Sequence, residues 1–376
     1  MPAEGAKLPK KTFRIDCGGL RGQSGGREGK KLVRNGRFPR YHVVTTHNRG
    51  MGMTRRAALA MFVLLLAALP AAAQKPGPVW PSRQVKVIVP FGAGSTPDVI
   101  MRLIADHLKD SLGQPFVVEN KPGASGNLGT DAIAKAEPDG YTIGISIGGP
   151  LAINPLLFGN MPYDPQKDLA FITLLTSQPS ALAVNPALGV DRVAALVALL
   201  KQNPGKYNYG SIGAGSLSQL AMEAIALASG TRIVHVPYPS SPAAMTALIR
   251  NDVQMACLPA IAVTPHAEAG KVKILAITSA KPSALLPGIP TLKQAGIDVE
   301  ADAWNGLVAP AKTPPPVLAA IRAAVIEALA APTIRQKLAA QIMEPTPSTP
   351  EEFRARIDAD IARWRPVIEA ANIRVN

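Results

Sequence analysis

The tetrapeptide Gly-Ala-Gly-Ser occurs twice in this chain of 376 residues, at positions 92–95 and 213–216. Each copy follows a short run with strand character and precedes a stretch with helical periodicity. A third glycine-rich turn, at 123–126, follows the run Phe-Val-Val-Glu. A turn between a strand and a helix directs free backbone N–H groups and the positive end of the helix dipole to one place. Such turns hold anions, and their presence in both halves indicates two lobes around one small acidic molecule.

The elements that position these turns alternate along most of the chain. Apolar runs predict strands at 85–89, 116–120, 141–146, 169–176, 180–185, 207–210, 233–236, 253–258 and 273–278, with an extended segment at 299–309. Helical patterns start at 96 and cover 126–136, 191–202, 216–229, 242–250, 261–269, 315–330, 333–340 and 349–371.

Prolines mark the start of the first helix and the segment 147–168. Thr96 is expected to cap that helix, with Pro97 in its first turn. The segment 147–168, which contains four prolines, is expected to be mostly loop. Repeated strand–helix units predict an α/β fold with parallel sheets covered by helices. Ligands of such folds bind at the carboxyl ends of the strands, where the glycine turns fall.

The N-terminus carries most of the net charge of +14, because residues 1–50 contribute +9. Two arginines, a 13-residue apolar run and three alanines at 71–73 predict a cleaved export signal at 53–73, of the Sec or twin-arginine type. The apolar run is shorter than the roughly 20 residues of a membrane span. Residues 1–52 are interpreted as a disordered, non-native extension before a later translation start. An uncleaved anchor and a basic, nucleic-acid-binding arm remain as alternatives.

The remaining chain, from 74 onward, gives few signs of chemistry beyond the turns. Its single cysteine, Cys257, lies in an apolar run and is expected to be a buried structural thiol. His235 and His266 have no partner at metal-binding spacing, so we expect no metal site and no cofactor. The low positive charge of this part does not favour a nucleic-acid partner.

Several motifs occur in an order typical of one family. They lie at 90–94, 98–102, 119–129, 138–142, 163–165, 235–238, 286–292, 304–307 and 309–314, and include Pro-Asp-Gly-Tyr-Thr, His-Val-Pro-Tyr and Trp-Asn-Gly-Leu. On these motifs the chain resembles, over 80–376, the Bug-type extracytoplasmic receptors of tripartite tricarboxylate transporters. Three positions depart from the family pattern: the first Gly-Ala-Gly-Ser turn, Gln219 and the Pro-Ser pair at 239–240.

The resemblance implies a two-lobed periplasmic-binding-protein fold, similar to type II, in which each lobe is a mostly parallel sheet flanked by helices. Lobe 1 is expected to contain 74–178 and 301–376, and lobe 2 to contain 179–300, joined by a hinge near 176–181 and Trp304. The implied protein is a periplasmic monomer that closes on a small carboxylate ligand. It delivers this ligand to the membrane permease subunits of the transporter and performs no chemistry on it.

The residues expected to bind the ligand lie in the glycine turns, at neighbouring strand ends and in the following helices. They are Phe91, Gly92, Ala93, Gly94, Ser95, Asp98, Ala124, Ser125, Gly126, Asn127, Ser146, Gly148, Ser211, Gly215, Ser216, Tyr238 and Ser240. Asp98 has a second interpretation, because an acid in the first helical turn also complements the helix dipole.

Three other functions are compatible with parts of the sequence. The same receptor fold can feed a membrane signalling kinase instead of a permease. A dinucleotide-binding enzyme matches the first glycine turn, but Pro97 stands near the place of the third glycine. A hydrolase lacks support, because no serine stands in a recognisable nucleophile elbow and no histidine has a clear triad context.

Overall fold

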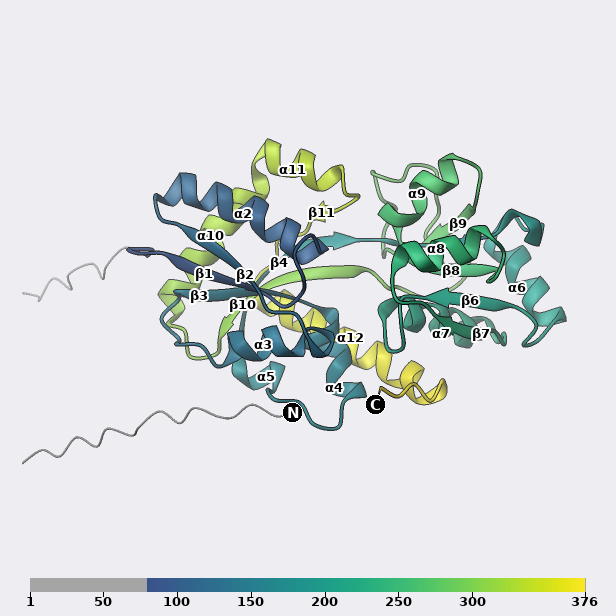
Figure 1. Cartoon of the computed structure of the whole chain (residues 1–376), viewed down its shortest axis with the longest axis horizontal. Helices are drawn as coiled ribbons and strands as arrows, with labels where there is room; N and C mark the ends of the chain where they lie inside the picture. Colours follow the sequence, from purple (N-terminus) through teal and green to yellow (C-terminus); the bar gives the residue numbers. More distant parts are fainter. Residues whose placement is uncertain (1–79, 376) are drawn as a thin grey trace, which may run out of the picture. The chain divides into compact units, whose positions relative to one another are not determined.

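The computed structural model describes residues 80–375, and the predicted extension at 1–52 and signal at 53–73 lie outside this range. The described chain forms two β-sheets, each covered by helices on both faces (Figure 1). The α/β, two-lobed architecture predicted from the sequence is confirmed.

The first sheet has the strand order β11-β4-β10-β3-β1-β2. Its strands are β1 (Val85–Val89), β2 (Phe116–Asn120), β3 (Thr142–Ile147), β4 (Leu169–Gln178), β10 (Ala303–Pro310) and β11 (Glu344–Pro345). Strands β1, β2 and β3 are parallel, whereas β10 is antiparallel to both β3 and β4, and β11 is antiparallel to β4.

The second sheet has the order β7-β6-β8-β5-β9. Its strands are β5 (Ser180–Val184), β6 (Asn208–Ser211), β7 (Val234–Pro237), β8 (Met255–Pro259) and β9 (Lys273–Ile277). Here β7, β6 and β8 are parallel, and β5 is antiparallel to β8 and β9. Most strands of each sheet run in one direction, as predicted, but both sheets are mixed. In the first sheet β10 and β11 run against β1, β2, β3 and β4. In the second sheet β5 runs against the other strands.

Apart from α4 and α5, the helices lie where the periodicity predicts them, with ends shifted by up to about two residues, as is usual for helix boundaries. They are α2 (Thr96–Leu112), α3 (Asn127–Ala134), α4 (Asn154–Leu157), α5 (Pro165–Asp168), α6 (Val193–Gln202), α7 (Leu217–Ser229), α8 (Ser241–Ile249), α9 (Ala260–Glu268), α10 (Pro315–Ala330), α11 (Pro332–Ala339) and α12 (Pro350–Ala370). Ser95, not Thr96, is the N-cap of α2, and its side chain makes no capping hydrogen bond.

The segment 147–168 differs from the expected loop. It contains a π-helical turn, Gly149–Ile153, followed by α4 and α5. Pro150, Pro155 and Pro165 lie in the first turns of these short helices, where a missing N–H group costs no hydrogen bond. The sequence analysis also missed β11, which consists of two residues.

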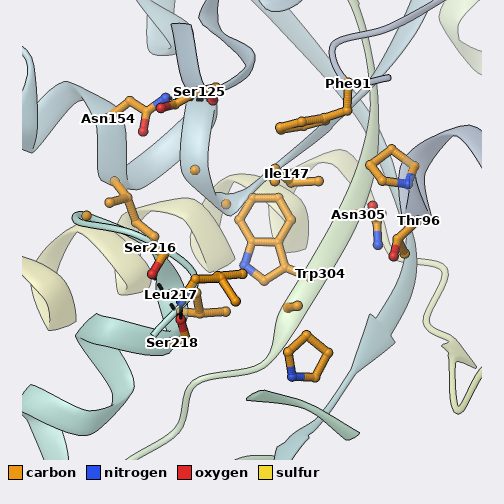
Figure 2. A pocket seen from close by; sticks show the side chains of 18 of the residues that line it. Phe91, Thr96, Ser125, Ile147, Asn154, Ser216, Leu217, Ser218, Trp304 and Asn305 are labelled. Atoms are coloured by element: carbon orange, nitrogen blue, oxygen red, sulfur yellow. Dashed lines mark hydrogen bonds between the residues drawn. The ribbon is translucent and has the colours of Figure 1, made fainter. Parts of the chain in front are cut away.

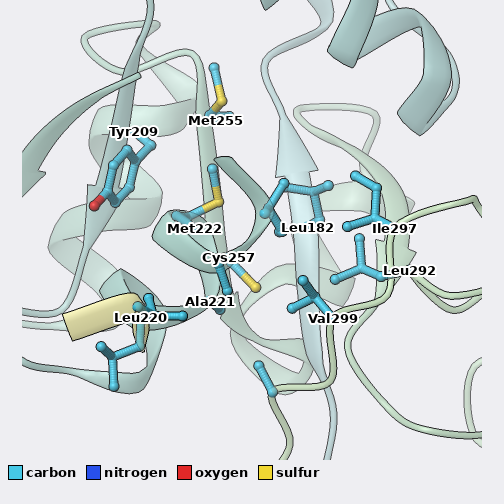
Figure 3. Close-up of a cluster of buried hydrophobic side chains, with 14 of the residues drawn as sticks. Leu182, Tyr209, Leu220, Ala221, Met222, Met255, Cys257, Leu292, Ile297 and Val299 are labelled. Carbon is cyan, nitrogen blue, oxygen red and sulfur yellow. The ribbon is translucent and has the colours of Figure 1, made fainter. Parts of the chain in front are cut away.

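Four clusters of buried side chains fill the four sheet–helix interfaces. Helices α2, α10 and α11 cover one face of the first sheet, and α3 with the first part of α12 covers the other. On the second sheet, α8 and α9 cover one face, and α6 and α7 cover the other (Figure 1). Figure 3 shows the core under α7, with Leu182, Tyr209, Met222 and Cys257. Cys257 is fully buried, as expected, and burial raises its pKa to about 12.

Helix α12 contributes to the cores of both sheets. Near its start, the Phe353 ring packs against Phe171 of β4 and Trp304 of β10, with centroids 5.2 and 5.6 Å apart. Near its end, Trp364 and Val367 join the cluster under α7. The helix therefore connects the two sheets, in addition to the strands that cross between them.

No single helix within 80–375 is long and apolar enough to span a membrane. Helices α10 and α11 pass the length and composition test only when joined, and they are bent by 69°.

A candidate ligand site between the two sheets

A cavity of about 470 Å³ lies where the ends of both sheets meet. The first sheet and its helices supply most of its wall, and the second sheet supplies the start of β5, the turn between β6 and α7, and the end of β8. All three glycine turns found in the sequence reach this cavity. They contribute Phe91, Ser95, Thr96, Ser125, Gly215 and Ser216 to its lining.

The turn between β1 and α2 is held from behind by Asp98. Gly94 adopts a positive φ of 78°, and its N–H donates to Asp98 Oδ2 at 2.8 Å. Burial alone would raise the pKa of Asp98, but hydrogen bonds from Arg102, Gly94 and Asn120 outweigh burial, so its pKa is lowered. The carboxylate thus stabilises the turn and does not line the cavity. The hydroxyl of Ser95 does line it, and this buried Oγ atom has no hydrogen-bond partner among the described residues.

The turn between β2 and α3 has an unusual backbone. Ala124 and Ser125 have φ angles of 46° and 54°, a region that non-glycine residues rarely adopt. Asn154 of α4 supports the turn, because its Nδ2 donates to the Ser125 carbonyl at 3.1 Å and to Asn127 Oδ1 at 2.7 Å. The Tyr163 hydroxyl donates to the same Asn127 oxygen at 3.1 Å. Strained backbone that the surrounding structure holds in place is common at ligand sites.

The turn between β6 and α7 carries its own hydrogen-bond network. Ser216 caps α7, accepting from the Gln219 N–H at 3.4 Å and donating to the Gly213 carbonyl at 2.6 Å. Gln219 returns a bond through Oε1, which accepts from the Gly215 N–H at 2.8 Å. Ser211 Oγ accepts from the Gly213 N–H at 3.2 Å and lies 2.6 Å from His235 Nε2. Burial lowers the pKa of His235, which favours its neutral form.

The strand β10 forms the floor of the cavity. Figure 2 shows the Trp304 ring in the centre, between Ile147 on one side and Leu217 on the other. A Cβ atom at Gly148 would lie 3.3 Å from this ring, so glycine leaves room for the indole there. The indole Nε1 donates to Asp360 Oδ2 of α12 at 2.7 Å.

Two buried acids, Asp302 and Asp360, lie in the cavity wall. Asp360 is compensated, because Arg356 and Arg363 lie 3.3 and 2.8 Å from its Oδ1 atom. Both arginines also pair with Glu300, at 2.9 and 3.3 Å. Asp302 receives only hydroxyl bonds, from Ser177 at 3.2 Å and Thr278 at 3.5 Å, and burial raises its pKa to about 6. Among the described residues that line the cavity there is no lysine, arginine or histidine.

The structure brings six of the predicted ligand residues to the cavity, and places the others behind it or elsewhere. The six are Phe91, Ser95, Ser125, Gly148, Gly215 and Ser216. The predicted residues that do not line it are Gly92, Ala93, Gly94, Asp98, Ala124, Gly126, Asn127, Ser146, Ser211, Tyr238 and Ser240.

Most of the residues in the second group have structural partners that explain their position. Ser146 Oγ is 3.1 Å from Thr130 Oγ1 in the interior, and Tyr238 packs against the core under α8. Ser240 caps α8 and accepts from the Ala243 N–H. A Cβ atom at Gly126 would lie 2.7 Å from the Phe91 ring, so this glycine allows Phe91 to reach the cavity.

Sequence reasoning missed several lining residues that come from the segments crossing between the sheets, from the end of β8, and from the π-helical turn and α4 with the residue after it. These are Ile153, Asn154, Leu157, Phe158, Gln178, Ser180, Pro259, Asp302 and Asn305. The apolar spacing within 147–168 was the available signal for some of them. Gln178, Ser180 and Asn305 had none, because only the pairing of β4 and β10 and the crossing to β5 bring them to the cavity.

The described residues contain no cluster of three or more His, Cys, Asp or Glu side chains that could hold a metal ion. Two sheets joined by crossing strands, with a cavity lined from both, define the chain as a two-lobed solute-binding protein.

Comparison with known proteins identifies the family of solute-binding proteins to which the chain belongs. The model of the tripartite tricarboxylate transporter family receptor matches residues 100–373. BugT of Bordetella pertussis is 35% identical over 320 residues, which cover 85% of this chain and 98% of BugT. The chain belongs to the tripartite tricarboxylate transporter receptor family, and a solved Bug member is a periplasmic binding protein.

Two solved structures are also similar. An R. palustris protein solved with adipate is 34% identical, with a TM-score of 0.68 over 78% of this chain and 99% of its own. MatC from Rhodopseudomonas palustris, solved with bound malate, is 29% identical, with a TM-score of 0.64 over 77% and 100% of the two chains.

Proposed function

We propose that this protein is a periplasmic receptor that binds a small carboxylate and passes it to the permease subunits of a tripartite tricarboxylate transporter. The observation that carries the proposal is the convergence of three glycine turns, from both sheets, on one cavity. Two of these turns are followed by the N-termini of α2 and α7, whose dipoles favour an anion. The adipate and malate held by two relatives support the ligand class.

The binding mode that fits this cavity uses neutral donors. The hydroxyl group of Ser95 and backbone N–H groups of the turns would hold the carboxylate, while Phe91, Ile147 and Trp304 would contact its carbon atoms. Neutral, preorganised donors can bind an anion well when the site excludes water. The receptor would leave its ligand chemically unchanged, and the crossing strands near 176–181 and Trp304 would serve as the hinge for closure.

Titration calorimetry tests the proposal. The protein is unfolded and refolded to remove retained ligand, then titrated with malate, adipate, citrate, hexanoate and glutamate. We expect at least one of these acids to bind, and the double variant Ser95→Ala/Ser216→Ala to bind it at least about tenfold more weakly. Ser240→Ala is the matched control, because Ser240 lies outside the cavity and should leave the affinity unchanged. Binding of none of the acids by correctly refolded protein would contradict the proposed ligand class.

Export is tested separately, by mass spectrometry of the protein recovered from the periplasm of its native host. We propose that the mature chain starts near residue 74. Peptides from 53–73 in that fraction would contradict cleavage at this point.

A further inference from the structure

Asn305 lines the cavity and carries a buried polar atom without a partner. It lies on β10, opposite Ile147 of β3 and Thr176 of β4, and only 3% of its surface is exposed. Its Nδ2 atom is 3.1 Å from Thr176 Oγ1. Its Oδ1 atom is buried and has no hydrogen-bond partner among residues 80–375. Buried polar atoms are nearly always paired, so this atom indicates a partner that the protein itself does not supply.

The surroundings of Asn305 suit an anion. In Figure 2 its carboxamide lies on the same side of the cavity as Thr96 and Phe91, beside the first residues of α2. Ser95, which precedes Thr96 in the chain and also lines the cavity, has a hydroxyl that is buried and without a partner among the described residues. Two unpaired side chains and the positive end of a helix therefore line one part of the cavity.

The amide group of Asn305 can adopt two orientations, which exchange the positions of its Oδ1 and Nδ2 atoms. The Thr176 hydroxyl both donates and accepts, so it can pair with either end of the amide. When Thr176 donates to Oδ1, the Nδ2 group is free to face the cavity. A carboxylate only accepts hydrogen bonds, and an anion beside the α2 N-terminus would select this second orientation.

We propose that Asn305 is a ligand-binding residue that donates from Nδ2 to a carboxylate oxygen, with Thr176 fixing the orientation of its amide. This inference rests on the proposed function, because it requires an acidic ligand. It adds the hinge strand β10 to the glycine turns as a source of ligand contacts. Since β10 begins where the chain returns from the second sheet to the first, a ligand held there would contact the hinge itself as well as the lobes.

Two nearly isosteric substitutions test the proposal with malate, adipate and hexanoate as probes. Asn305→Leu removes the donor, and we expect about tenfold weaker binding of the acids that bind the wild type. Asn305→Asp replaces the donor by a second carboxylate, and we expect at least a hundredfold loss at pH 8 through repulsion in a buried site. Asn372→Asp adds the same charge at an exposed position outside the cavity and should change the affinity less than twofold.

The Thr176→Val variant tests the role assigned to Thr176. It should weaken binding severalfold in the wild type and have no further effect in Asn305→Leu, because the two residues act through one bond. Melting of each unliganded variant shows that the compared proteins are folded.

The possible outcomes separate the two proposals. Binding of none of the probes by the wild type would overturn the proposed function and this inference with it. Binding by the wild type, with unchanged affinity in Asn305→Asp, would overturn the role of Asn305 alone. If Asn305→Asp does not fold, Asn305→Leu decides, and an unchanged affinity in that variant overturns the role equally.

Discussion

Asp302 should make the stability of this protein depend on pH in a direction opposite to that of most aspartates. Its side chain is buried between β4, the residue after β9 and α12, and only 9% of its surface is exposed. Burial raises its pKa from 3.8 to about 6, against the partial compensation by Arg356 and the hydroxyls of Ser177 and Thr278. Nearby Glu300 also raises it, and Asp302 in turn raises the pKa of Cys257.

The direction in which the unfolding free energy changes with pH follows from proton uptake on folding. Between pH 3.8 and 6 the folded protein holds a proton on Asp302 that the unfolded chain has released, so stability falls as pH rises. Above pH 6 both states are ionised, and the loss is complete. A pKa difference from 3.8 to about 6 corresponds to about 3 kcal/mol of unfolding free energy. This stability is present at acid pH and absent at neutral pH.

Asp302→Asn removes the titration while keeping the size and the acceptor for Ser177. Urea unfolding of both proteins, followed by circular dichroism at several pH values from 4 to 8, isolates the effect, because the other groups titrate equally in both. We expect the variant to gain about 3 kcal/mol relative to the wild type over this range, and the difference to become constant above about pH 7. Asp358→Asn, at an exposed position on α12, controls for the change in net charge. A difference between wild type and variant that does not change with pH would refute the reasoning.

Two further substitutions test the packing and the charge network behind the cavity. A Cβ atom at Gly306 would overlap the Phe353 ring, so Gly306→Ala should lower the unfolding free energy, measured in urea, by about 1–3 kcal/mol. Gly92→Ala is the control, because nothing lies within 4 Å of a Cβ atom there. Equal unfolding free energies of the Gly306→Ala variant and the wild type would contradict the packing. Asp360→Ala removes the acceptor of the Trp304 indole and one of the two carboxylates that pair with Arg356 and Arg363. It should cost about 3 kcal/mol and change the Trp304 fluorescence. A loss below about 1 kcal/mol would mean that water replaces the carboxylate.

Most of the fold was predictable because its strands and helices follow periodic apolar patterns and many of them end at a glycine or proline. The strand at 85–89 and the helix at 315–330 have the predicted bounds. The direction of the strands was not predictable in the same way. Whether β10 runs parallel or antiparallel to β3 depends on a return from the second sheet, which no local pattern encodes. The two-residue β11 is too short to carry a periodic signal.

The site was predictable where a glycine turn marks it and not where tertiary pairing creates it. Ser95 and Ser216 each follow a glycine and precede a helix, and both line the cavity. Asp98 fits the same pattern, but its side chain accepts hydrogen bonds from Arg102 and Asn120 and stabilises the backbone of the turn instead of lining the cavity. Asn305 was visible in the sequence only as part of a motif. Its relation to the cavity depends on the register between β10 and β3.

The cavity combines an acidic wall with a proposed acidic ligand, and the position of each charge resolves the apparent conflict. Asp360 is neutralised by arginines on its own helix, so it presents little net charge to the ligand space. Burial raises the pKa of Asp302 to about 6, so its repulsion of an anion weakens as the pH falls toward and below 6. An anion would then be attracted by peptide dipoles alone, and these act strongly only over the first helical turn. Affinity would therefore depend on both sets of turns reaching the same ligand at once. A receptor built this way needs no cationic residue in its site, because closure of the lobes around the ligand supplies the second set of donors.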